Sequence, residues 1–270
     1  MSAPERSRPA VSGLPVGDLL ADGPVTADLP VPASALAIGA HPDDIEFGCG
    51  ATLAKWAAAG CRLHHLVLTD GSKGSWDPAA DLAALVAERA AECRRAATVL
   101  DGGTVSEPAD RVLFLGGVDG ELDNRPDQRR EVARIVRKLR PRVVLGHDPW
   151  RRYRLHPDHR HAGFLTLDSL VAARDPHFFP ELDLQPHRPD HLLLWEADLP
   201  NHVEASGQFE ATKVEALLVH ASQRQSTMGI GSDDRADVST LAEKVHRQLG
   251  SHGELAGVPT GEAFRLLSDL

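Results

Sequence analysis

Two short stretches of the sequence combine histidine and aspartate at a spacing that suits metal chemistry. The first holds His41, Asp43 and Asp44, and the second holds His156 and His159. Residues three positions apart point in a similar direction on a turn or first helical turn, so each motif can present its side chains together. Two imidazoles, a carboxylate and an open position are the arrangement with which catalytic zinc holds and acidifies a water. The sequence predicts a metal site if the two motifs meet.

The adjacent carboxylates of the first motif need different roles, because they repel each other unless a cation or a proton intervenes. A metal would separate them: one aspartate ligates, and its neighbour takes a proton from water. In the second motif, Asp158 can hydrogen-bond a flanking imidazole and fix its tautomer. The alternative is structural, since His-Pro-Asp segments are also good turn and helix-start material. The presence of both motifs favours the metal site.

From residue 35 onward, short aliphatic runs alternate with segments of helical periodicity, which is typical of βα units and a mostly parallel sheet. Strands are predicted at 35–40, 62–69, 111–116, 142–147 and 191–197. Helices are predicted at 47–59, 79–100, 127–139, 159–173, 208–220 and 239–249, with an exposed loop at 226–237. The predicted fold is α/β: a Rossmann-like, mostly parallel sheet flanked by helices, forming one domain over 34–270. Residues 1–33 are predicted to be a mobile N-terminal arm.

The polar, chemically capable residues follow the ends of the predicted strands. "HPDD" comes after the first strand, "DGSKG" after the second, "GVDGELD" after the third and "HDPWRRYRLHPDH" after the fourth. Parallel strands all end at one edge of the sheet, and ligands of open α/β sheets bind at that edge. The active site is therefore expected at the C-terminal edge of the strands.

Composition excludes several classes of protein. The formal net charge of −10 disfavours nucleic acid as a partner. The odd number of cysteines, three, without metal-binding spacing, predicts buried thiols in a reducing compartment. No apolar run approaches the 18 residues of a membrane helix, and prolines and glycines interrupt the N-terminal segment, so a cytoplasmic protein without a membrane span is expected. A homo-oligomer is compatible with the sequence.

The motifs also resemble a known family. "AHPDDIEFGCGATLAKWAAAGC", "LVLTDGSKG", "ERAAECRRAATVL", "HPDH" and "KVEALLVHASQ" are similar to the metal-dependent N-deacetylases of the LmbE/PIG-L type, over about residues 35–225. That family includes deacetylases of mycothiol and bacillithiol synthesis and of N-acetylglucosaminyl-phosphatidylinositol. The resemblance implies a Rossmann-like fold, Zn²⁺ with Fe²⁺ as the alternative metal, and a small-molecule N-acetylated sugar as substrate.

The resemblance also implies roles for individual residues. His41, Asp44 and His159 would be the metal ligands, and Asp43 the general base. The implied catalytic pair in the second motif is His156, oriented by Asp158, which would stabilise the oxyanion and help to protonate the leaving amine.

The resemblance extends to further positions. Arg89 and Asp119 stand where similar proteins hold sugar hydroxyls; the alternatives are an exposed helix partner of a glutamate and a turn residue. Arg154 stands where some relatives have a tyrosine, next to Tyr153, the only tyrosine of the chain. His147 ends the fourth predicted strand, on the expected active edge.

The predicted reaction is hydrolysis of an acetamide to acetate and a free amine, with an N-acetylated amino sugar conjugate as substrate. Alternatives are an amidase acting on another small amide such as a thiol-sugar conjugate, a non-haem iron oxygenase with two histidines and one carboxylate, and a non-catalytic binding scaffold. A dinucleotide enzyme would need G-x-G-x-x-G after the first strand, which is absent. Trp76 and Trp150, in the loops 72–81 and 149–155, are expected to form pocket walls.

Overall fold

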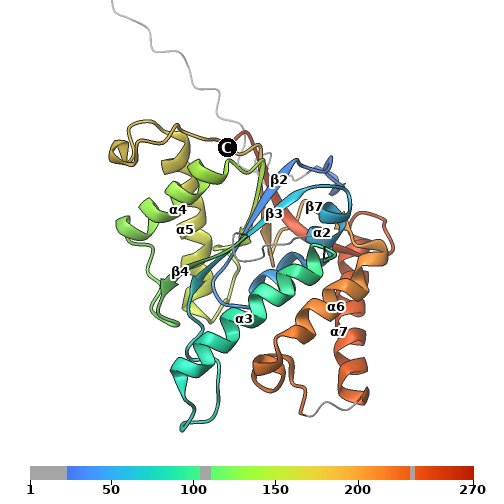
Figure 1. Ribbon diagram of the computed structural model, residues 1–270. Coiled ribbons are helices and arrows are strands. Elements are labelled where there is room, and N and C mark those ends of the chain that lie inside the picture. Colours follow the sequence, from blue (N-terminus) through green and yellow to red (C-terminus); the bar gives the residue numbers. More distant parts are fainter. Residues whose placement is uncertain (1–22, 104–110, 232–234) are drawn as a thin grey trace, which may run out of the picture.

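The chain folds around a single twisted sheet (Figure 1). The computed structural model describes residues 23–103, 111–231 and 235–270. Within these residues the sheet has eight strands in the order β1-β7-β8-β6-β5-β2-β3-β4. Their bounds are β1 Thr26–Ala27, β2 Ser34–Gly39, β3 Arg62–Thr69, β4 Val112–Gly117, β5 Val143–His147, β6 His191–Trp195, β7 His202–Ala205 and β8 Gly261–Ser268. Only β8 pairs antiparallel with its neighbours, so this is a mostly parallel sheet.

Helices cover both faces of the sheet. They are α2 (Asp44–Ala58), α3 (Leu82–Leu100), α4 (Pro126–Leu139), α5 (Pro157–Arg174), α6 (Glu210–Val219) and α7 (Arg235–Glu254), with the short helical segments η2 (Pro180–Leu182), η3 (Gly207–Phe209), η4 (Ala221–Gln223) and η5 (Arg224–Met228). Helices α4 and α5 lie on one side, and α2, α3, α6 and α7 lie on the other (Figure 1). The predicted α/β architecture is confirmed.

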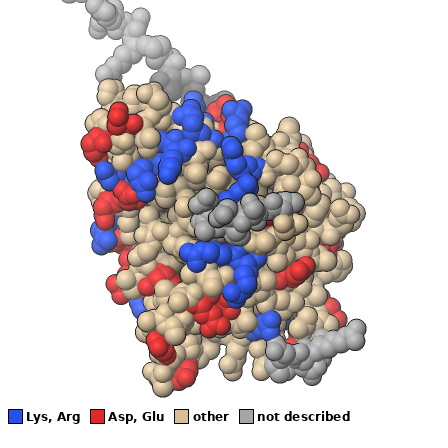
Figure 2. All heavy atoms as spheres, in the orientation of Figure 1, with Lys and Arg blue, Asp and Glu red and all other residues tan. Residues whose placement is uncertain are grey.

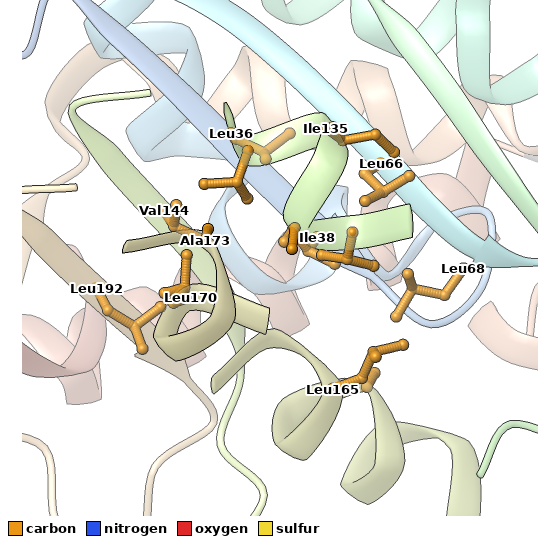
Figure 3. Packing of buried hydrophobic residues seen from close by; sticks show 14 of the residues in the cluster. Leu36, Ile38, Leu66, Leu68, Ile135, Val144, Leu165, Leu170, Ala173 and Leu192 are labelled. Atoms are coloured by element: carbon orange, nitrogen blue, oxygen red, sulfur yellow. The ribbon is translucent and has the colours of Figure 1, made fainter. Parts of the chain in front are cut away.

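Strand β2 shows how the sequence specifies this layered arrangement. All six of its residues are buried, because successive side chains point to opposite faces and both faces are covered. Leu36 and Ile38 belong to the apolar cluster under α4 and α5 (Figure 3), whereas Ala35 and Ala37 belong to the cluster under α2. Burial of each leucine or isoleucine contributes about 1.5–3 kcal/mol. The strand therefore holds the first motif at a fixed place on the sheet edge.

All five predicted strands are present, as β2 to β6, but three strands were missed. β1 has two residues and β7 has four, too short for an alternating pattern to be visible. The prediction of an exposed loop at 226–237 is wrong in part. Met228 and Ile230 are buried against α6 and α7, and α7 begins at Arg235.

The N-terminal segment differs from the prediction of a mobile arm where it can be followed. Residues 1–22 lie outside the described residues. Thr26 and Ala27 pair with β7, and the backbone N–H of Leu29 donates to Glu204 Oε1 at 2.8 Å. Residues 26–29 therefore belong to the sheet edge. The assignment of 34–270 to one domain stays a prediction.

Two further expectations concern the surface and the thiols. All three cysteines are buried and free, as predicted. None of the helices in the described ranges combines the length and apolar character that a membrane crossing needs. Basic and acidic side chains share the face drawn in Figure 2, where the basic ones form short clusters.

Candidate metal centre and active-site cavity

A cavity of about 350 Å³ opens at the C-terminal edge of the parallel strands. Both sequence motifs reach it, because β2 ends directly before the first and β5 leads into the loop that carries the second. Its lining comprises His41, Asp43, Asp44, Lys73, Gly74, Ser75, Trp76, Arg89, Asp119, Gly120, His156, Pro157, His159, Gln223, Ser226 and Thr227. Of the predicted site residues, only Asp158 lies behind the lining, and it is fully buried.

His41 is fixed by two carboxylates behind its ring. Its Nε2 lies 3.1 Å from Asp158 Oδ2 and 3.3 Å from Asp119 Oδ1. Burial opposes a charge on His41, but the hydrogen bonds to Asp119 and Asp158 outweigh it and raise the pKa of His41 well above its usual range. Because Nε2–H donates to these carboxylates, Nδ1 is the nitrogen that faces Asp44 and His159.

Asp44 has one engaged oxygen and one that faces the histidine cluster. Oδ2 accepts hydrogen bonds from the His41 backbone N–H at 2.7 Å and lies 3.2 Å from His147 Nε2. Oδ1 lies 3.2 Å from His159 Nε2. Burial opposes ionisation, but His159 and His147, which face the carboxylate at hydrogen-bond distance, outweigh it and lower the pKa of Asp44 well below its usual range. The carboxylate is therefore ionised and suited to hold a cation.

The three predicted ligands converge at a spacing that fits a small metal ion. His41 Nδ1 lies 3.1 Å from His159 Nε2 and 3.3 Å from Asp44 Oδ2, and His159 Nε2 lies 3.2 Å from the other carboxylate oxygen, Oδ1. A tetrahedral zinc with bonds of about 2.0–2.1 Å separates its ligand atoms by about 3.3 Å. With one donor atom from each residue, the described residues form three compact sets: His41 with His156 and His159, Asp44 with His147 and His159, and His41 with Asp119 and Asp158. The predicted ligands are shared between the first two of these sets. The donor atoms present fit a zinc-type ion.

The outer side of His159 is less typical of a metal ligand. Its Nδ1 accepts a hydrogen bond from Arg154 Nε at 2.9 Å, and Arg154 also pairs with Glu196. A guanidinium can only donate. Ligation through Nε2 puts a proton on Nδ1, so Arg154 has to leave this hydrogen bond when an ion binds.

Asp43 is buried, strained and incompletely paired. Its backbone has φ 109°, a conformation that residues other than glycine rarely adopt. Oδ1 lies 3.6 Å from Arg89 Nη2, whereas Oδ2 has no hydrogen-bond partner among the described residues. Burial raises the pKa of Asp43 to about 7; the charge of Arg89 opposes this rise and that of Asp44 adds to it. A carboxylate with such a pKa suits a general base near neutral pH.

His156 stands at the start of α5 with its ring in the cavity. Ring centroids lie 4.6 Å from His41 and 4.9 Å from His159. Burial lowers the pKa of His156, and the charges of His41 and His159 lower it further. These surroundings favour the neutral ring, which donates one N–H.

Asp158 has a different partner from the one predicted. We expected it to orient a flanking imidazole, His156 in particular, but it hydrogen-bonds His41 and accepts the backbone N–H groups of Gly120 at 2.6 Å and Leu122 at 3.2 Å. The carboxylate thus ties α5 to the loop after β4. Spacing within one motif could not reveal a contact between two motifs.

Arg89 is buried, with 3% of its surface exposed, so the exposed-helix alternative is wrong. Its guanidinium donates to the carbonyl oxygens of Gly71 and Pro42, both at 2.7 Å. A Cβ at Gly71 or at Gly74 would lie within 2.6 Å of the guanidinium, so these glycines make room for it. Arg89 therefore braces the loops after β2 and β3 as well as lining the cavity.

Several other positions depart from the sequence analysis. Gln223, Ser226 and Thr227 form a polar wall of the cavity. Gln223 ends the motif "KVEALLVHASQ" but received no role in the predicted site, and Ser226 and Thr227 lie in the loop that we predicted to be exposed. Trp76 lines the cavity, whereas Trp150 packs against Phe164 instead. The last two candidates differ in their location: Tyr153 is 88% exposed, whereas His147 is buried and contacts Asp44.

The fold and the cavity together define an α/β enzyme whose acidic and imidazole groups follow the ends of parallel strands. The sequence model of the family described as "PIG-L: GlcNAc-PI de-N-acetylase" matches residues 36–170. The chain belongs to this family.

Individual relatives agree with the family assignment. The chain is 34% identical to a diacetylchitobiose deacetylase of Thermococcus kodakarensis, over 70% of this chain and 69% of the relative. It is 27% identical to a 1D-myo-inositol 2-acetamido-2-deoxy-alpha-D-glucopyranoside deacetylase of Catenulispora acidiphila, over 92% and 82%. The solved structure of N,N'-diacetylchitobiose deacetylase from Pyrococcus horikoshii superposes with a TM-score of 0.77 at 28% identity, covering 88% of this chain and 84% of that one.

Proposed function

We propose that this protein is a zinc-dependent hydrolase that removes the acetyl group from an N-acetylglucosamine-type conjugate. The observation that carries the proposal is the juxtaposition of Asp43, a buried carboxylate with a free oxygen and a pKa of about 7, with the compact set His41, Asp44 and His159. A ligand set beside a separate base is what amide hydrolysis requires. The named activities of the relatives agree with this reaction.

His41, Asp44 and His159 would hold the ion, with Fe²⁺ as the alternative to Zn²⁺. A bound zinc ion supplies Lewis acidity, which polarises the acetyl carbonyl and lowers the pKa of water. The carboxylates Asp119 and Asp158 behind His41 keep its Nε2–H engaged and so keep its ring in one orientation.

Asp43 takes the proton from the attacking water. Its free Oδ2 is the acceptor, and Arg89, 3.6 Å from Oδ1, limits how far burial raises its pKa. The N–H of His156 donates to the oxyanion that forms on the acetyl oxygen. As negative charge builds on that oxygen, His156 takes a proton from solvent and passes it to the leaving amine while the C–N bond breaks, and Asp43 returns the proton of the attacking water to solvent, so that acetate and a free amine result.

The part of the substrate beyond the acetamide is an amino sugar, whose hydroxyls contact the polar wall of the cavity. Gln223, Ser226 and Thr227 offer donors and acceptors on one side of the cavity, and the exposed indole of Trp76 offers an apolar face at the rim. A thiol-sugar conjugate would use the same wall. The iron oxygenase alternative is not favoured, because the relatives are deacetylases and Asp43 stands ready as a base.

The test is acetate release from N-acetylglucosamine, N,N′-diacetylchitobiose and an N-acetylglucosaminyl inositol, with zinc-loaded wild type beside Asp43→Asn. We expect release by the wild type and loss in the variant while zinc stays bound at one per chain. Release that is equal in both proteins would reject Asp43 as the base. Absence of release from all three compounds by the loaded wild type would reject the proposed substrate class.

A further inference from the structure

His147 lies directly behind the candidate metal centre, although it does not line the cavity. It is 2% exposed, and its ring stacks on that of His159 at a centroid distance of 4.5 Å. By distance alone, its Nε2 belongs to a compact set with Asp44 and His159. Its role therefore has to be decided from the hydrogen bonds around the ring.

Trp195 decides which ring nitrogen of His147 carries the proton. The indole Nε1–H donates to His147 Nδ1 at 3.1 Å, and an indole nitrogen can only donate. Nδ1 is therefore an acceptor, and the proton of the neutral ring sits on Nε2. Glu196, the other group near Nδ1, lies at 3.8 Å, beyond hydrogen-bond reach.

With its proton on Nε2, His147 can donate to Asp44. Nε2 lies 3.2 Å from Asp44 Oδ2. The backbone N–H of Ala40 approaches the same nitrogen at 3.4 Å. The contact with Ala40 is longer than the contact with Asp44. If Nε2 accepted from the Ala40 N–H, both ring nitrogens of His147 would be acceptors, and a neutral imidazole must carry a proton on one of them. The carboxylate is the better partner.

The position of Trp195 is set by the sheet and by α2. Trp195 is the neighbour of His147 in the pairing of the parallel strands β5 and β6, and a Cβ at residue 48 would lie only 2.5 Å from the indole ring. Gly48 of α2 therefore lets the indole pack close enough to reach His147. Trp195 itself is 1% exposed, so water does not compete for the hydrogen bond.

We propose that His147 is a positioning residue, which donates Nε2–H to Asp44 Oδ2 and is itself held by Trp195. Together with the His41 backbone N–H, this donation occupies Oδ2 and leaves Oδ1 for a cation. His147 is then excluded from the ligand set, because its protonated Nε2 has no lone pair to offer and the closely packed indole of Trp195 cannot leave Nδ1, whereas the flexible side chain of Arg154 can leave His159 Nδ1. This inference rests on the metal site of the proposed function, but not on the reaction or the substrate.

The experiment compares zinc affinity and Co²⁺ spectra of His147→Phe, His147→Gln and Trp195→Phe with the wild type. We expect His147→Phe to weaken zinc binding about 10- to 100-fold, as is usual when a group that orients a ligand is lost. Trp195→Phe, which removes one hydrogen bond, should weaken it about 5-fold. His147→Gln should stay within about 3-fold of the wild type, since its amide N–H can replace Nε2–H.

The Co²⁺ absorption bands should keep their shape and intensity in all three variants, because the coordination number is unchanged. His187→Phe is the matched control, since it removes a buried histidine that contacts the Pro141 carbonyl away from the cavity. A changed Co²⁺ spectrum in His147→Phe, or equal losses in the Phe and Gln variants, would make His147 a ligand and overturn the proposal. An unchanged zinc affinity in His147→Phe would also overturn it. A wild type that binds neither metal would instead reject the metal site itself.

Discussion

The floor and the rim of the cavity are built in opposite ways. On the floor, His41, Asp44 and Asp158 are buried, and each is held by two or more polar contacts from different elements. At the rim, Trp76 is 83% exposed and the Lys73 side chain is 53% exposed. A floor with so many fixed partners can support one chemistry, whereas an exposed rim can change without disturbing the fold. The reaction type should therefore depend on the floor and the choice of substrate on the rim.

The largest effect is expected from Asp43→Asn on the floor. Loss of a general base should lower kcat about 10²- to 10⁴-fold while the zinc content stays at one per chain. Steady-state acetate release and metal analysis measure the two quantities. Asp123→Asn is the control, because it changes an exposed carboxylate outside the cavity lining. A variant that lost zinc together with activity would mean that Asp43 acts as a ligand rather than a base.

Arg89→Met should have the next largest effect, on the pH profile as well as the rate. The charge of Arg89 keeps the pKa of Asp43 from rising further, and a base works only above its pKa. Removing this charge should therefore move the acidic limb of the kcat/KM profile to higher pH. The protein should also be less stable, because the buried carbonyl oxygens of Gly71 and Pro42 lose their donor. Each unsatisfied carbonyl should lower the free energy of unfolding by about 1–3 kcal/mol.

If the acidic limb of the kcat/KM profile does not move in Arg89→Met, Arg89 does not influence the pKa of the base, and its role is only structural. Arg94→Met provides a matched control on the same helix, α3, because its guanidinium lies over the Phe114 ring and outside the cavity lining. We expect that variant to keep the wild-type profile.

Trp76→Ala tests the rim with a smaller effect. If the indole contacts the group attached to the amino sugar, KM for N,N′-diacetylchitobiose should rise about 2- to 10-fold, the size of one aromatic contact, with kcat little changed. KM for N-acetylglucosamine itself should not move. Trp150→Ala is the control, since that exposed indole packs on Phe164 and does not line the cavity. Equal increases for both substrates would place Trp76 against the sugar ring itself.

The smallest effect on activity is expected from His64, a buried histidine of β3 that does not line the cavity. Burial lowers the pKa of His64 to about 4, and the charges of Arg111 and Arg62 add to this. The unfolded chain therefore binds a proton more readily than the folded one, and stability should fall as pH drops from about 6.5 to 4. His64→Gln should flatten this decline by at most about 3 kcal/mol in chemical denaturation, with activity at pH 7 unchanged. An equal slope in both proteins would contradict the assigned cause.

The sequence predicted the meeting of His41 with His159 well, because both motifs follow strands of a parallel sheet and must share an edge. It did not predict that Asp158 holds His41 or that Trp195 reaches His147. Those contacts cross between elements, and they depend on how closely the elements approach, as at Gly48. Local spacing carries no information about such contacts.

The missed elements lack a local pattern that the sequence could reveal. β8 is antiparallel at the end of the chain and its last residues are partly exposed, so it lacks the continuous apolar run that marks a buried parallel strand. The polar wall around Gln223 was missed because it approaches the cavity through η4 and η5, short helical segments without a periodic pattern.

The most direct test of the account is a crystal structure of the zinc-loaded protein with anomalous diffraction recorded at the zinc edge. We expect one strong peak within bonding distance of His41 Nδ1, Asp44 Oδ1 and His159 Nε2, with Asp43 nearby but not bonded. A peak on the opposite side of the His41 ring, between Nε2, Asp119 and Asp158, or one bonded to His147, would contradict it.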